Sequence, residues 1–473
     1  MDAILLLPPE PIERAKTEHK RETGMSIALI ILAAGKGTRM ESDLPKVLHR
    51  IAHAPMLWHA MRAGQSLEPA RSIVVAGHEA EHVAASAQAF DPEARVVIQS
   101  EQLGTAHAAL QAGPELEGFD GDAIVLYGDT PFISQDTLED MARARAEHDV
   151  VVLGFEAADP GRYGRLVTEG DALIRIVEYK DATDEERAIS LCNSGVVAAD
   201  AATLQSLLAE VKNDNAAGEY YLPDIVEIAR ARGLSAGVVH CAEAETLGVN
   251  SRAELAGAEA SFQQAIRARL MADGVTLQAP ETCWFAWDTV IGRDAEIEPN
   301  VIFGPGATIE SGARIRAFSH LEGCHVSRGA IVGPFARLRP GAELAEHTHV
   351  GNFVEIKNAY LGEGAKANHL TYLGDADIGE GSNIGAGTIT CNYDGVFKHR
   401  TTIGRNAFIG SDTMLVAPVT IGDGAMTGSG SVITDDVAPG ALALGRAKQV
   451  EKAGFATRLF DMLKAKKAKQ NKG

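Results

Sequence analysis

The sequence predicts an α/β fold in two parts, an open, mainly parallel sheet followed by a long β-helix. From Met25 to about Asn250, short Val/Ile-rich runs alternate with helical patterns, as in βαβ units. From Ile291 onward, aliphatic residues recur every six residues, which is the period of a β-helix. One amphipathic stretch, 251–274, separates the two parts. A chain of 473 residues is long enough to bury a core in each.

Composition excludes several classes of protein. A net charge of -20 argues against a partner such as nucleic acid or an anionic membrane, although a local basic patch stays possible. The five cysteines include no C-x-x-C pair, which indicates reduced thiols in a cytoplasmic protein. The apolar runs are too short to span a bilayer. Residues 1–24 make a poor signal peptide, and we expect either a disordered extension or a misassigned start before Met25.

The first predicted strand, 27–33, runs into a glycine-rich loop with basic residues. The loop reads Leu32-Ala33-Ala34-Gly35-Lys36-Gly37-Thr38-Arg39-Met40, and Pro45-Lys46 follows it. Backbone N–H groups exposed in such a turn, together with nearby basic side chains, suit a polyphosphate. The loop is neither a Walker A motif nor a G-x-G-x-x-G fingerprint. The alternative interpretation is an ordinary strand–turn–helix junction.

Four further strands and three helices are predicted in the first half. The strands are 72–76, 95–98, 123–126 and 150–155, and the helices are 47–61, 105–112 and 135–145. In open α/β sheets, ligands bind beyond the carboxyl ends of the strands. The residues just past each strand are therefore the candidates for a site.

Polar residues do stand beyond these strand ends. Gln99 and Gln102 follow the third strand, and amides can read the edge of a base by paired hydrogen bonds. Asp129 follows the fourth strand, where a carboxylate could hold Mg²⁺ or could simply serve as a turn or N-cap residue. Glu178 and Asn193 could bind sugar hydroxyls, or each could be a solvated strand end.

The stretch 251–272 predicts one helix about 30 Å long, at about 1.5 Å per residue. Its apolar residues fall at helical spacing, namely Leu255, Ala258, Phe262, Ile266 and Leu270. Asp273-Gly274 is a plausible end for this helix. A single apolar stripe fits either a rigid spacer between two active sites or a helix packed on the first domain.

The hexapeptide repeat places one aliphatic or aromatic residue in the core of each short strand. The repeating positions are Ile291, Ile297, Phe303, Ile309, Ile315, Leu321, Val332, Leu338, Leu344, Val350, Ile356, Ile378, Ile384, Ile403, Ile409, Leu415, Ile421 and, skipping Thr427, Ile433. A solenoid cannot bury its core with one turn, so the length of this run itself supports the assignment.

Function is expected where the repeat is interrupted. The sharpest interruption, 391–402, predicts an extruded loop that carries Lys398, His399 and Arg400. If a coil takes about eighteen residues, Arg339 and Lys357 lie one coil apart on one face, with 368–372 in the next coil. Two stacked cations suit a phosphate. His369 could move protons beside them, or it could be an ordinary surface histidine.

Several strings in the first half resemble the family of bifunctional bacterial N-acetylglucosamine-1-phosphate uridylyltransferases/glucosamine-1-phosphate acetyltransferases. They are 32–40, Pro45-Lys46, 101–107, 127–129, 218–221 and 248–250. The resemblance covers nearly everything after Met25 and implies a Rossmann-like nucleotidyltransferase domain over 25–250. It implies that UTP and UDP-N-acetylglucosamine contact Leu32, Ala33, Ala34, Gly35, Arg39, Lys46, Gln99, Gly104, Thr105, Tyr127, Gly128, Asp129, Gly164, Glu178, Asn193 and Asn250. Asp129 and Asn250 would hold Mg²⁺.

The second half resembles the acetyltransferase part of the same family in the strings 333–340, 369–375, 383–388 and 391–395. The resemblance implies a left-handed parallel β-helix over 275–446 that assembles as a homotrimer. It makes His369 the general base. It implies that glucosamine 1-phosphate contacts Arg339, Lys357, Tyr372 and Asn383, and that acetyl-CoA contacts Ala386, Asn392, Tyr393, Ser411, Ser429 and Arg446.

The activity implied is synthesis of UDP-N-acetylglucosamine, a precursor of peptidoglycan and lipopolysaccharide, from small-molecule substrates in the cytoplasm. The alternative is a monofunctional nucleotidylyltransferase whose β-helix is structural or regulatory. Ser429 departs from the smaller residue usual in the family, which leaves the shape of the acetyl-CoA site open. The tail 447–473 carries eight Lys/Arg against Glu451 and Asp461, and we expect it to be solvated and partly helical.

Overall fold

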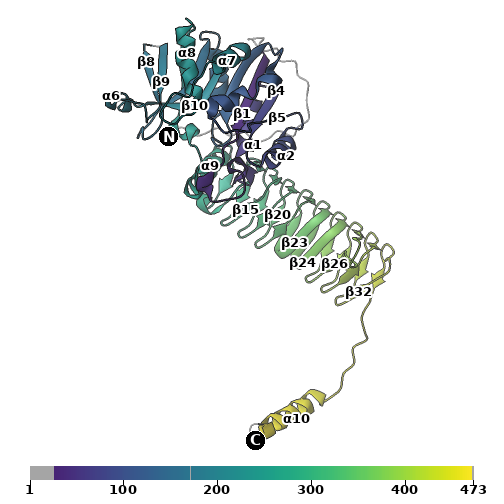
Figure 1. Cartoon of the computed structure of the whole chain (residues 1–473). Helices are drawn as coiled ribbons and strands as arrows, with labels where there is room; N and C mark the ends of the chain where they lie inside the picture. Colours follow the sequence, from purple (N-terminus) through teal and green to yellow (C-terminus); the bar gives the residue numbers. More distant parts are fainter. Residues whose placement is uncertain (1–25, 171, 471–473) are drawn as a thin grey trace. The chain divides into compact units, whose positions relative to one another are not determined.

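The computed structural model describes residues 26–170 and 172–470 (Figure 1). The expected N-terminal extension, 1–24, lies outside the described residues. The chain forms two compact units, Met1–Ser311 and Gly312–Gly473. The first holds a nine-stranded sheet, a long helix and the first strands of the repeat, and the second holds the remaining repeats and the tail.

The sheet of the first unit has the order β11-β7-β10-β6-β1-β4-β5, with β8 and β9 joined to it through β10. The strands are β1 Ser26–Ala33, β4 Arg71–Ala76, β5 Arg95–Ile98, β6 Gly121–Tyr127, β7 Val150–Glu156, β8 Arg165–Glu169, β9 Ala172–Val177, β10 Leu191–Asp200 and β11 Ala236–Cys241. All five predicted strands are present. β10 is antiparallel to both β6 and β7, so the sheet is mixed. β1 pairs with β4 on one side and β6 on the other, which places a topological switch point at its carboxyl end.

Helices cover both faces of this sheet because alternate strand residues point to opposite sides. One core contains Ala28, Ile30 and Leu32 with the helices α3 Thr105–Leu110, α4 Gly113–Leu116, α7 Ala201–Leu208 and α8 Ile225–Ala231. The other contains Leu29 and Ile31 with α1 Met56–Gln65, α2 Ala80–Phe90 and α5 Gln135–Ala144. A short helix, α6 Asp184–Arg187, has no buried residues.

The predicted helix 47–61 is wrong over its first nine residues. The chain there forms a 3₁₀ turn, Lys46–Leu48, and a hairpin of β2 Arg50–Ile51 and β3 Ala54–Pro55. The residues between the two strands, Ala52 and His53, have φ of 49° and 71°. A helix cannot pass through such left-handed residues, and Pro55 has no N–H to donate within one. The helix α1 therefore begins only at Met56.

The predicted connecting helix is α9, Arg252–Ala272, and it ends at Asp273 as expected. It packs on its neighbours within the first unit instead of standing free. Glu259 accepts a hydrogen bond of 2.7 Å from the backbone of Ala52, and Gln263 exchanges hydrogen bonds of 2.7 and 3.0 Å with the backbone of Phe285. The alternative of a packed helix is therefore confirmed.

The repeat forms a parallel β-helix, and most of its strands pair with the third strand after them, so a coil typically contains three strands. The two long strands, β23 His349–Leu361 and β24 Lys366–Ile378, pair directly with each other instead. In the first unit the strands are β12 Thr276–Leu277, β13 Val290–Ile291, β14 Glu296–Ile297, β15 Ile302–Phe303 and β16 Thr308–Ile309. In the second unit they are β17 Arg314–Ile315, β18 His320–Leu321, β19 Cys324–Val326, β20 Ile331–Val332, β21 Arg337–Leu338, β22 Ala342–Leu344, β23 His349–Leu361, β24 Lys366–Ile378, β25 Asn383–Ile384, β26 Ile389–Cys391, β27 Thr401–Ile403, β28 Phe408–Ile409, β29 Met414–Val416, β30 Val419–Ile421, β31 Met426–Thr427, β32 Val432–Ile433 and β33 Leu442–Ala443.

Every residue predicted for the repeat core is buried, from Ile291 to Ile433. Thr427, which the repeat skips, is also buried and occupies an equivalent inward position. Its hydroxyl accepts a hydrogen bond of 3.0 Å from the backbone of Gly410, so a polar side chain is tolerated in this core.

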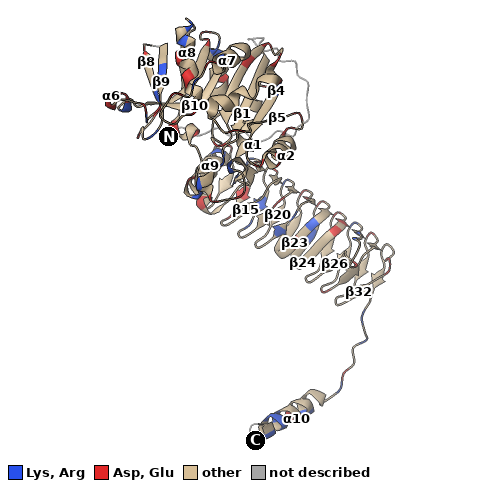
Figure 2. Ribbon diagram, viewed as in Figure 1, with Lys and Arg blue, Asp and Glu red and all other residues tan. Residues whose placement is uncertain are grey.

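The second unit ends in the helix α10, Phe455–Gln470, which has no buried residues. Lys and Arg concentrate on this helix (Figure 2), as expected for a solvated basic tail. In the described part of the chain no helix is long and apolar enough to cross a bilayer. All five cysteines are free thiols, as predicted.

Candidate active sites

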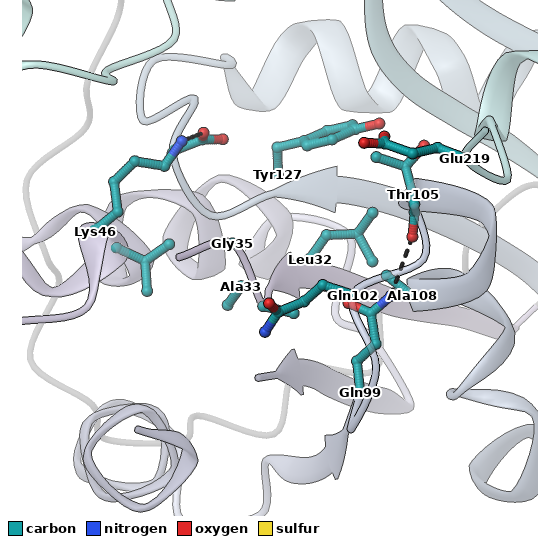
Figure 3. A pocket seen from close by; sticks show the side chains of 14 residues that line it. Leu32, Ala33, Gly35, Lys46, Gln99, Gln102, Thr105, Ala108, Tyr127 and Glu219 are labelled. Atoms are coloured by element: carbon teal, nitrogen blue, oxygen red, sulfur yellow. Dashed lines mark hydrogen bonds and ion pairs between the residues drawn. The ribbon is translucent and has the colours of Figure 1, made fainter. Parts of the chain in front are cut away.

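A cavity of about 300 Å³ opens at the switch point of the first sheet (Figure 3). Three strand ends form it: the residues after β1, those after β5 and those after β6. Its lining comprises Leu32, Ala33, Ala34, Gly35, Lys46, Val47, Gln99, Gln102, Gly104, Thr105, Ala108, Tyr127, Asp129 and Glu219. Ten of these are residues that the sequence analysis assigns to a nucleotide site.

The glycine-rich loop after β1 leads into a 3₁₀ turn, Thr38–Met40, and not into an α-helix. The two glycines have different roles. A Cβ on Gly35 would meet nothing within 4 Å, so this backbone is open toward the cavity. Gly37 has φ of 60°, and a Cβ there would lie 2.6 Å from Cβ of Lys46. Gly37 therefore lets the loop pass close to Lys46, while exposed Arg39 does not line the cavity.

Lys46, Asp129 and Asn250 converge although they are far apart in the sequence. The ammonium of Lys46 donates a hydrogen bond to Oδ2 of Asp129 and one of 3.0 Å to Oδ1 of Asn250. The backbone N–H of Val249 also donates to the carbonyl of Asp129, at 3.0 Å. Asp129 does not cap a helix, since Ser134 is the N-cap of α5. Two side-chain oxygens thus face one cation.

The other end of the cavity is lined by amides and a glycine turn. Gln99 is only 3% exposed, and its amide nitrogen lies 3.1 Å from the carbonyl of Gly104 and 3.0 Å from Nδ1 of His107. Gly104 has φ of 122°, and a Cβ there would lie 2.4 Å from the carbonyl oxygen of Tyr220. Thr105 accepts a hydrogen bond of 2.9 Å from the backbone of Leu222. These contacts hold the turn close to the segment 219–222.

Three of the residues assigned to the sugar meet beside this cavity. A Cβ on Gly164 would lie 3.1 Å from Oε1 of Glu178 and 3.5 Å from Cβ of Asn193. The backbone N–H of Asn193 donates to the carbonyl of Gly164 at 2.9 Å. Burial raises the pKa of the Glu178 carboxyl, and the nearby carboxylates of Asp224 and Asp181 raise it further. Burial also raises the pKa of Tyr127 above its usual value.

Asp224 lies near Glu178, one of the residues assigned to the sugar, and we predict that its carboxyl lowers the free energy of unfolding at neutral pH. Burial raises its pKa to about 6, and the carboxylates of Glu227, Asp214 and Asp181 contribute. Because the pKa of Asp224 is higher in the folded than in the unfolded state, ionisation of this carboxyl opposes folding. The protonated form is compatible with the folded state at low pH, and this contribution to stability is lost as pH rises through 6. A shift of this size corresponds to about 3 kcal/mol, which solvent screening of a half-buried group reduces to about 1 kcal/mol.

We therefore expect Asp224→Asn to raise the free energy of unfolding of the first unit by about 1 kcal/mol at pH 8 and by about half as much at pH 5. Urea unfolding at both pH values measures this difference. The matched control is Asp184→Asn, because the Asp184 side chain is 99% exposed. An equal effect of Asp224→Asn at both pH values would contradict the prediction.

The cavity also contains residues that the sequence analysis did not assign to it. Glu219 belongs to a string that carries the resemblance, whereas Val47 and Ala108 gave no signal. Gln102, one of the two amides expected to read a base, lines the cavity as well. Figure 3 shows Glu219 beside Tyr127 and Thr105, at the end of the cavity away from Lys46. No local pattern relates Glu219 to the other strand ends, because only the close approach of Tyr220 to Gly104 brings it there.

The second candidate site lies along one face of the β-helix in the second unit. Arg337 pairs with Glu355, and Glu355 with Tyr372, so three successive coils contribute to this face. The expected spacing of eighteen residues holds for Arg339 and Lys357, but the next coil is one residue shorter and sets Lys357 opposite Gly374.

His369 lies at one edge of this face. The strand register sets it opposite Asn352 of the coil before, and its Nδ1 is 2.8 Å from Oδ1 of Asn352. An amide oxygen accepts, so Nδ1 carries the hydrogen and Nε2 is the free acceptor. His369 is exposed, so this nitrogen can reach a substrate.

The same edge continues into the residues assigned to acetyl-CoA. The backbone N–H of Gly387 donates to the carbonyl of Leu370 at 3.1 Å, which places Ala386 one coil beyond His369. The N–H of Asp412 donates to the carbonyl of Ala386 at 2.7 Å, and the N–H of Gly430 to that of Ser411 at 2.8 Å. Ser411 and Ser429 therefore follow in the next two coils. Arg446 donates to the carbonyl of Ser429.

Cations gather at the other edge of the face. Lys357 lies against Lys398 of the extruded loop, and hydrogen bonding and repulsion from Lys398 lower its pKa, with a further contribution from Arg339. Arg339 is paired with Glu355 at 2.8 Å, yet its Nε is buried without a partner in the described structure. Lys398 joins this cluster only through folding, and the sequence analysis did not assign it to a substrate.

The extruded loop 391–402 is held to the β-helix near its two ends. Asn392 is buried and donates a hydrogen bond to Asp375, while exposed Tyr393 follows it. Arg400 forms an ion pair with Asp377. Asn383 lies elsewhere: it pairs with Lys366 on the neighbouring face, so the structure does not bring it together with Tyr372 of the same chain.

Comparison with known proteins assigns a class to each half. Residues 29–187 match the family model of the MobA-like NTP transferase domain, and residues 288–323 and 400–435 match the bacterial transferase hexapeptide repeats. The fold and the sites thus define a transferase with a Rossmann-like nucleotidyltransferase domain, a helical linker and a left-handed parallel β-helix of hexapeptide repeats. The predicted fold class is confirmed.

Curated relatives define the family more closely. The chain is 69% identical to the bifunctional protein GlmU of Ruegeria sp. over 95% of this chain and 100% of the relative. It is 64% identical to the protein of the same name from Jannaschia sp., over 95% of this chain and 99% of the relative. It is 70% identical to the bifunctional protein GlmU of Ruegeria pomeroyi, over 95% of this chain and 100% of the relative. The chain belongs to the family of bifunctional GlmU proteins.

Membership of this family confirms the predicted bifunctional enzyme. The first half is the uridylyltransferase and the second the acetyltransferase of UDP-N-acetylglucosamine synthesis. The alternative of a monofunctional enzyme with a purely structural β-helix is set aside by the bifunctional relatives, which match over nearly the whole chain.

Proposed function

We propose that the cavity of the first unit transfers UMP from UTP to N-acetylglucosamine 1-phosphate and that Asp129, Asn250 and Lys46 organise the reacting phosphates. The observation that carries this proposal is the convergence of these three side chains at one end of the nucleotide cavity. Transfer of this kind needs positioning and charge neutralisation rather than a protein nucleophile. The open backbone at Gly35 supplies N–H groups for phosphate, and Lys46 supplies a positive charge.

The pair Asp129 and Asn250 fits Mg²⁺. Mg²⁺ takes oxygen ligands and typically needs only one or two protein side chains beside phosphate and water. Carboxylate and amide oxygens are such ligands, and both reach the same ammonium of Lys46, so both can face one cation. When bound, the metal would neutralise charge on the triphosphate. Lys46 would then turn from the two oxygens to the phosphate.

The amide end of the cavity supports a preference for uracil. The nitrogen of Gln99 is engaged by Gly104 and His107, which leaves its amide oxygen to face the base. An oxygen acceptor there suits the N3–H of uracil, whereas N3 of cytosine is itself an acceptor. Gly164, Glu178 and Asn193 would bind the sugar hydroxyls, and Glu178 can accept hydrogen bonds from them.

In the second unit, His369 is the proposed general base. Its Nε2 would take a proton from the 2-amino group of glucosamine 1-phosphate as that amine attacks the thioester of acetyl-CoA. An amine attacks only when it is unprotonated, and a histidine held in one tautomer by Asn352 suits the transfer. The cluster of Arg339, Lys357 and Lys398 would bind the phosphate of the acceptor.

The remaining assignments follow the edge on which His369 lies. Ala386, Ser411 and Ser429 would line the acetyl-CoA chain in successive coils, and Arg446 would bind its phosphates. Tyr372 lies between the two edges and would contact the sugar. Ser429 is compatible with this arrangement, because its carbonyl and not its side chain contacts Arg446.

We further propose a homotrimer in the cytoplasm, assembled through the β-helix. Phe318, Phe335 and Phe353 form an exposed ladder with ring centroids 5.0 and 5.3 Å apart, and Leu370, 61% exposed, continues it. Exposed apolar ladders of this kind mark interfaces. Asn383 lies on a different face from Tyr372, so a cleft between two copies would bring the two residues to one substrate. The particle mass from sedimentation decides between one chain and three.

The test of the two proposed sites is magnesium removal from the full chain. Given glucosamine 1-phosphate, acetyl-CoA, UTP and Mg²⁺, the protein should release free thiol and then pyrophosphate. Excess EDTA should stop pyrophosphate release and leave thiol release within about twofold, because the proposed metal ligands lie only in the first unit. Pyrophosphate release that persists in EDTA would contradict the metal assignment. Loss of both activities would contradict separate sites.

A further inference from the structure

A buried carboxylate lies beneath the cation cluster of the second unit, and neither the reaction nor the resemblance assigns it a role. Asp375 is in β24, 8% exposed, with φ of 48°. Its Oδ1 accepts a hydrogen bond of 2.6 Å from Nδ2 of Asn358, and its Oδ2 accepts one of 2.5 Å from Nδ2 of Asn392. Asp375 therefore links Asn358, in the coil before it, to Asn392, near the start of the extruded loop 391–402.

These hydrogen bonds fix which end of each amide points where. An ionised carboxylate has no hydrogen to give, so Asn392 must turn its nitrogen toward Asp375. Its amide oxygen then faces away from Asp375. A Cβ on Gly374 would lie 2.3 Å from the hydroxyl of Tyr372 and 2.8 Å from Nδ2 of Asn392, so these two side chains meet over Gly374. The oriented amide thus lies beside a residue assigned to the sugar phosphate.

The surroundings keep Asp375 ionised. Burial works against its charged form, but the donated hydrogen bonds of Asn358 and Asn392 and the charges of Lys398 and Lys357 outweigh burial and hold its pKa below the usual value. The carboxylate is therefore ionised, and an acceptor, at neutral pH. An asparagine at position 375 carries both a donor and an acceptor, so it could form a hydrogen bond with either the nitrogen or the oxygen of the Asn392 amide.

We propose that Asp375 is a positioning residue for acetyl transfer, which holds the Asn392 amide with its oxygen toward the amine and hydroxyl donors of the acetyl acceptor. This inference rests on the proposed function and on the resemblance, which assigns Asn392 to acetyl-CoA and its neighbour Tyr372 to the acceptor. Asp375 itself is covered by Asn358 and Asn392, so its effect on kcat comes through Asn392.

A simpler role would be to anchor the loop, and the structure offers a matched control for it. Asp377, two residues later on the same strand, holds the same loop through Arg400 near its other end. Its side chain is 43% exposed and pairs with Arg400, whereas Asn392 donates its hydrogen bond to Asp375. Asp377→Asn removes an anchor of the loop and leaves the orientation of Asn392 unchanged.

The experiment compares kcat and KM for acetyl transfer to glucosamine 1-phosphate in Asp375→Asn, Asp377→Asn, Asn392→Ala and the double variant Asp375→Asn/Asn392→Ala. Uridylyl transfer by the same preparations reports folding. We expect Asp375→Asn to lower kcat at least tenfold without raising KM for the sugar phosphate, since removing a negative charge near Lys357 and Lys398 favours a bound phosphate. Asp377→Asn should change kcat less than threefold.

The double variant should be no slower than Asn392→Ala, because a residue that acts through Asn392 has no effect once that amide is gone. The inference would be overturned if the reduction of kcat in the double variant equalled the product of the two single reductions. Equal reductions of kcat in Asp375→Asn and Asp377→Asn would also overturn it. If Asn392→Ala itself keeps the wild-type kcat, the proposed acetyl-CoA site is wrong. If Asn392→Ala is slow and Asp375→Asn is not, only the positioning role fails.

Discussion

Asp129→Ala should reduce uridylyl transfer by at least about a thousandfold and leave acetyl transfer within about twofold. The carboxylate contributes one of the two side-chain oxygens that face a single cation at the phosphate end of the cavity. Without Asp129, the proposed Mg²⁺ would lose one of its two side-chain ligands, and Lys46 would lose its ion-pair partner. Electrostatic groups of this kind typically contribute several kcal/mol to a transition state. Pyrophosphate release measures the first activity and free thiol the second.

The matched control is Asp120→Ala, because Asp120 is an exposed carboxylate just before β6 and lies outside the cavity. It should leave both activities unchanged. If Asp129→Ala retains a tenth or more of the wild-type pyrophosphate release, Asp129 does not hold the metal. Loss of both activities in a folded protein would mean that the two halves do not work as separate sites.

His369→Ala should nearly abolish acetyl transfer, by about a hundred- to ten-thousandfold, and spare uridylyl transfer. General base catalysis typically contributes about this much. The loss should appear mainly in kcat, since the proposed binding site for the acceptor's phosphate lies among the cations at the other edge of the face. Free-thiol release from acetyl-CoA, with wild type and variant side by side, measures the effect.

His347→Asn is the control, because His347 is an exposed histidine of a nearby coil whose φ of 57° asparagine tolerates. Asn352→Ala removes the acceptor that fixes the tautomer of His369, and we expect it to lower kcat for acetyl transfer less than His369→Ala does. Acetyl transfer by His369→Ala at the wild-type rate would exclude His369 as the base. Absence of acetyl transfer in the wild type, with pyrophosphate release intact, would contradict activity in the second half.

Much of the fold was predictable because its signals are local and repeated. A six-residue period over many coils leaves one arrangement for the aliphatic residues, and every predicted core residue is buried. Five of the nine strands of the first sheet were also predicted, since apolar runs bounded by polar residues form buried parallel strands. The strands β8, β9, β10 and β11 were not predicted. The segment 47–61 was not, because its apolar spacing suits a helix whereas Ala52, His53 and Pro55 impose a hairpin.

The candidate sites divide in a similar way. Residues directly beyond strand ends, such as Gln99 and Asp129, could be proposed from sequence because parallel strands bring their carboxyl ends to one edge. Glu219, Lys398 and Asp375 could not. Each reaches its site through a contact between distant segments: Tyr220 against Gly104, Lys398 against Lys357, and Asn392 against Asp375.

The sequence by itself determined the class of each half, the period of the β-helix and the residue types available for chemistry. These depend on hydrophobic periodicity and on strings of neighbouring residues, which the linear order of the chain contains in full. Only the tertiary structure decided which of these side chains lie together in a candidate site. Lys46 meets Asn250 although the two are 204 positions apart in the sequence, and Asn383 lies on another face than Tyr372. Such pairings depend on strand order and coil register, which arise when the whole core is buried and not from any short stretch.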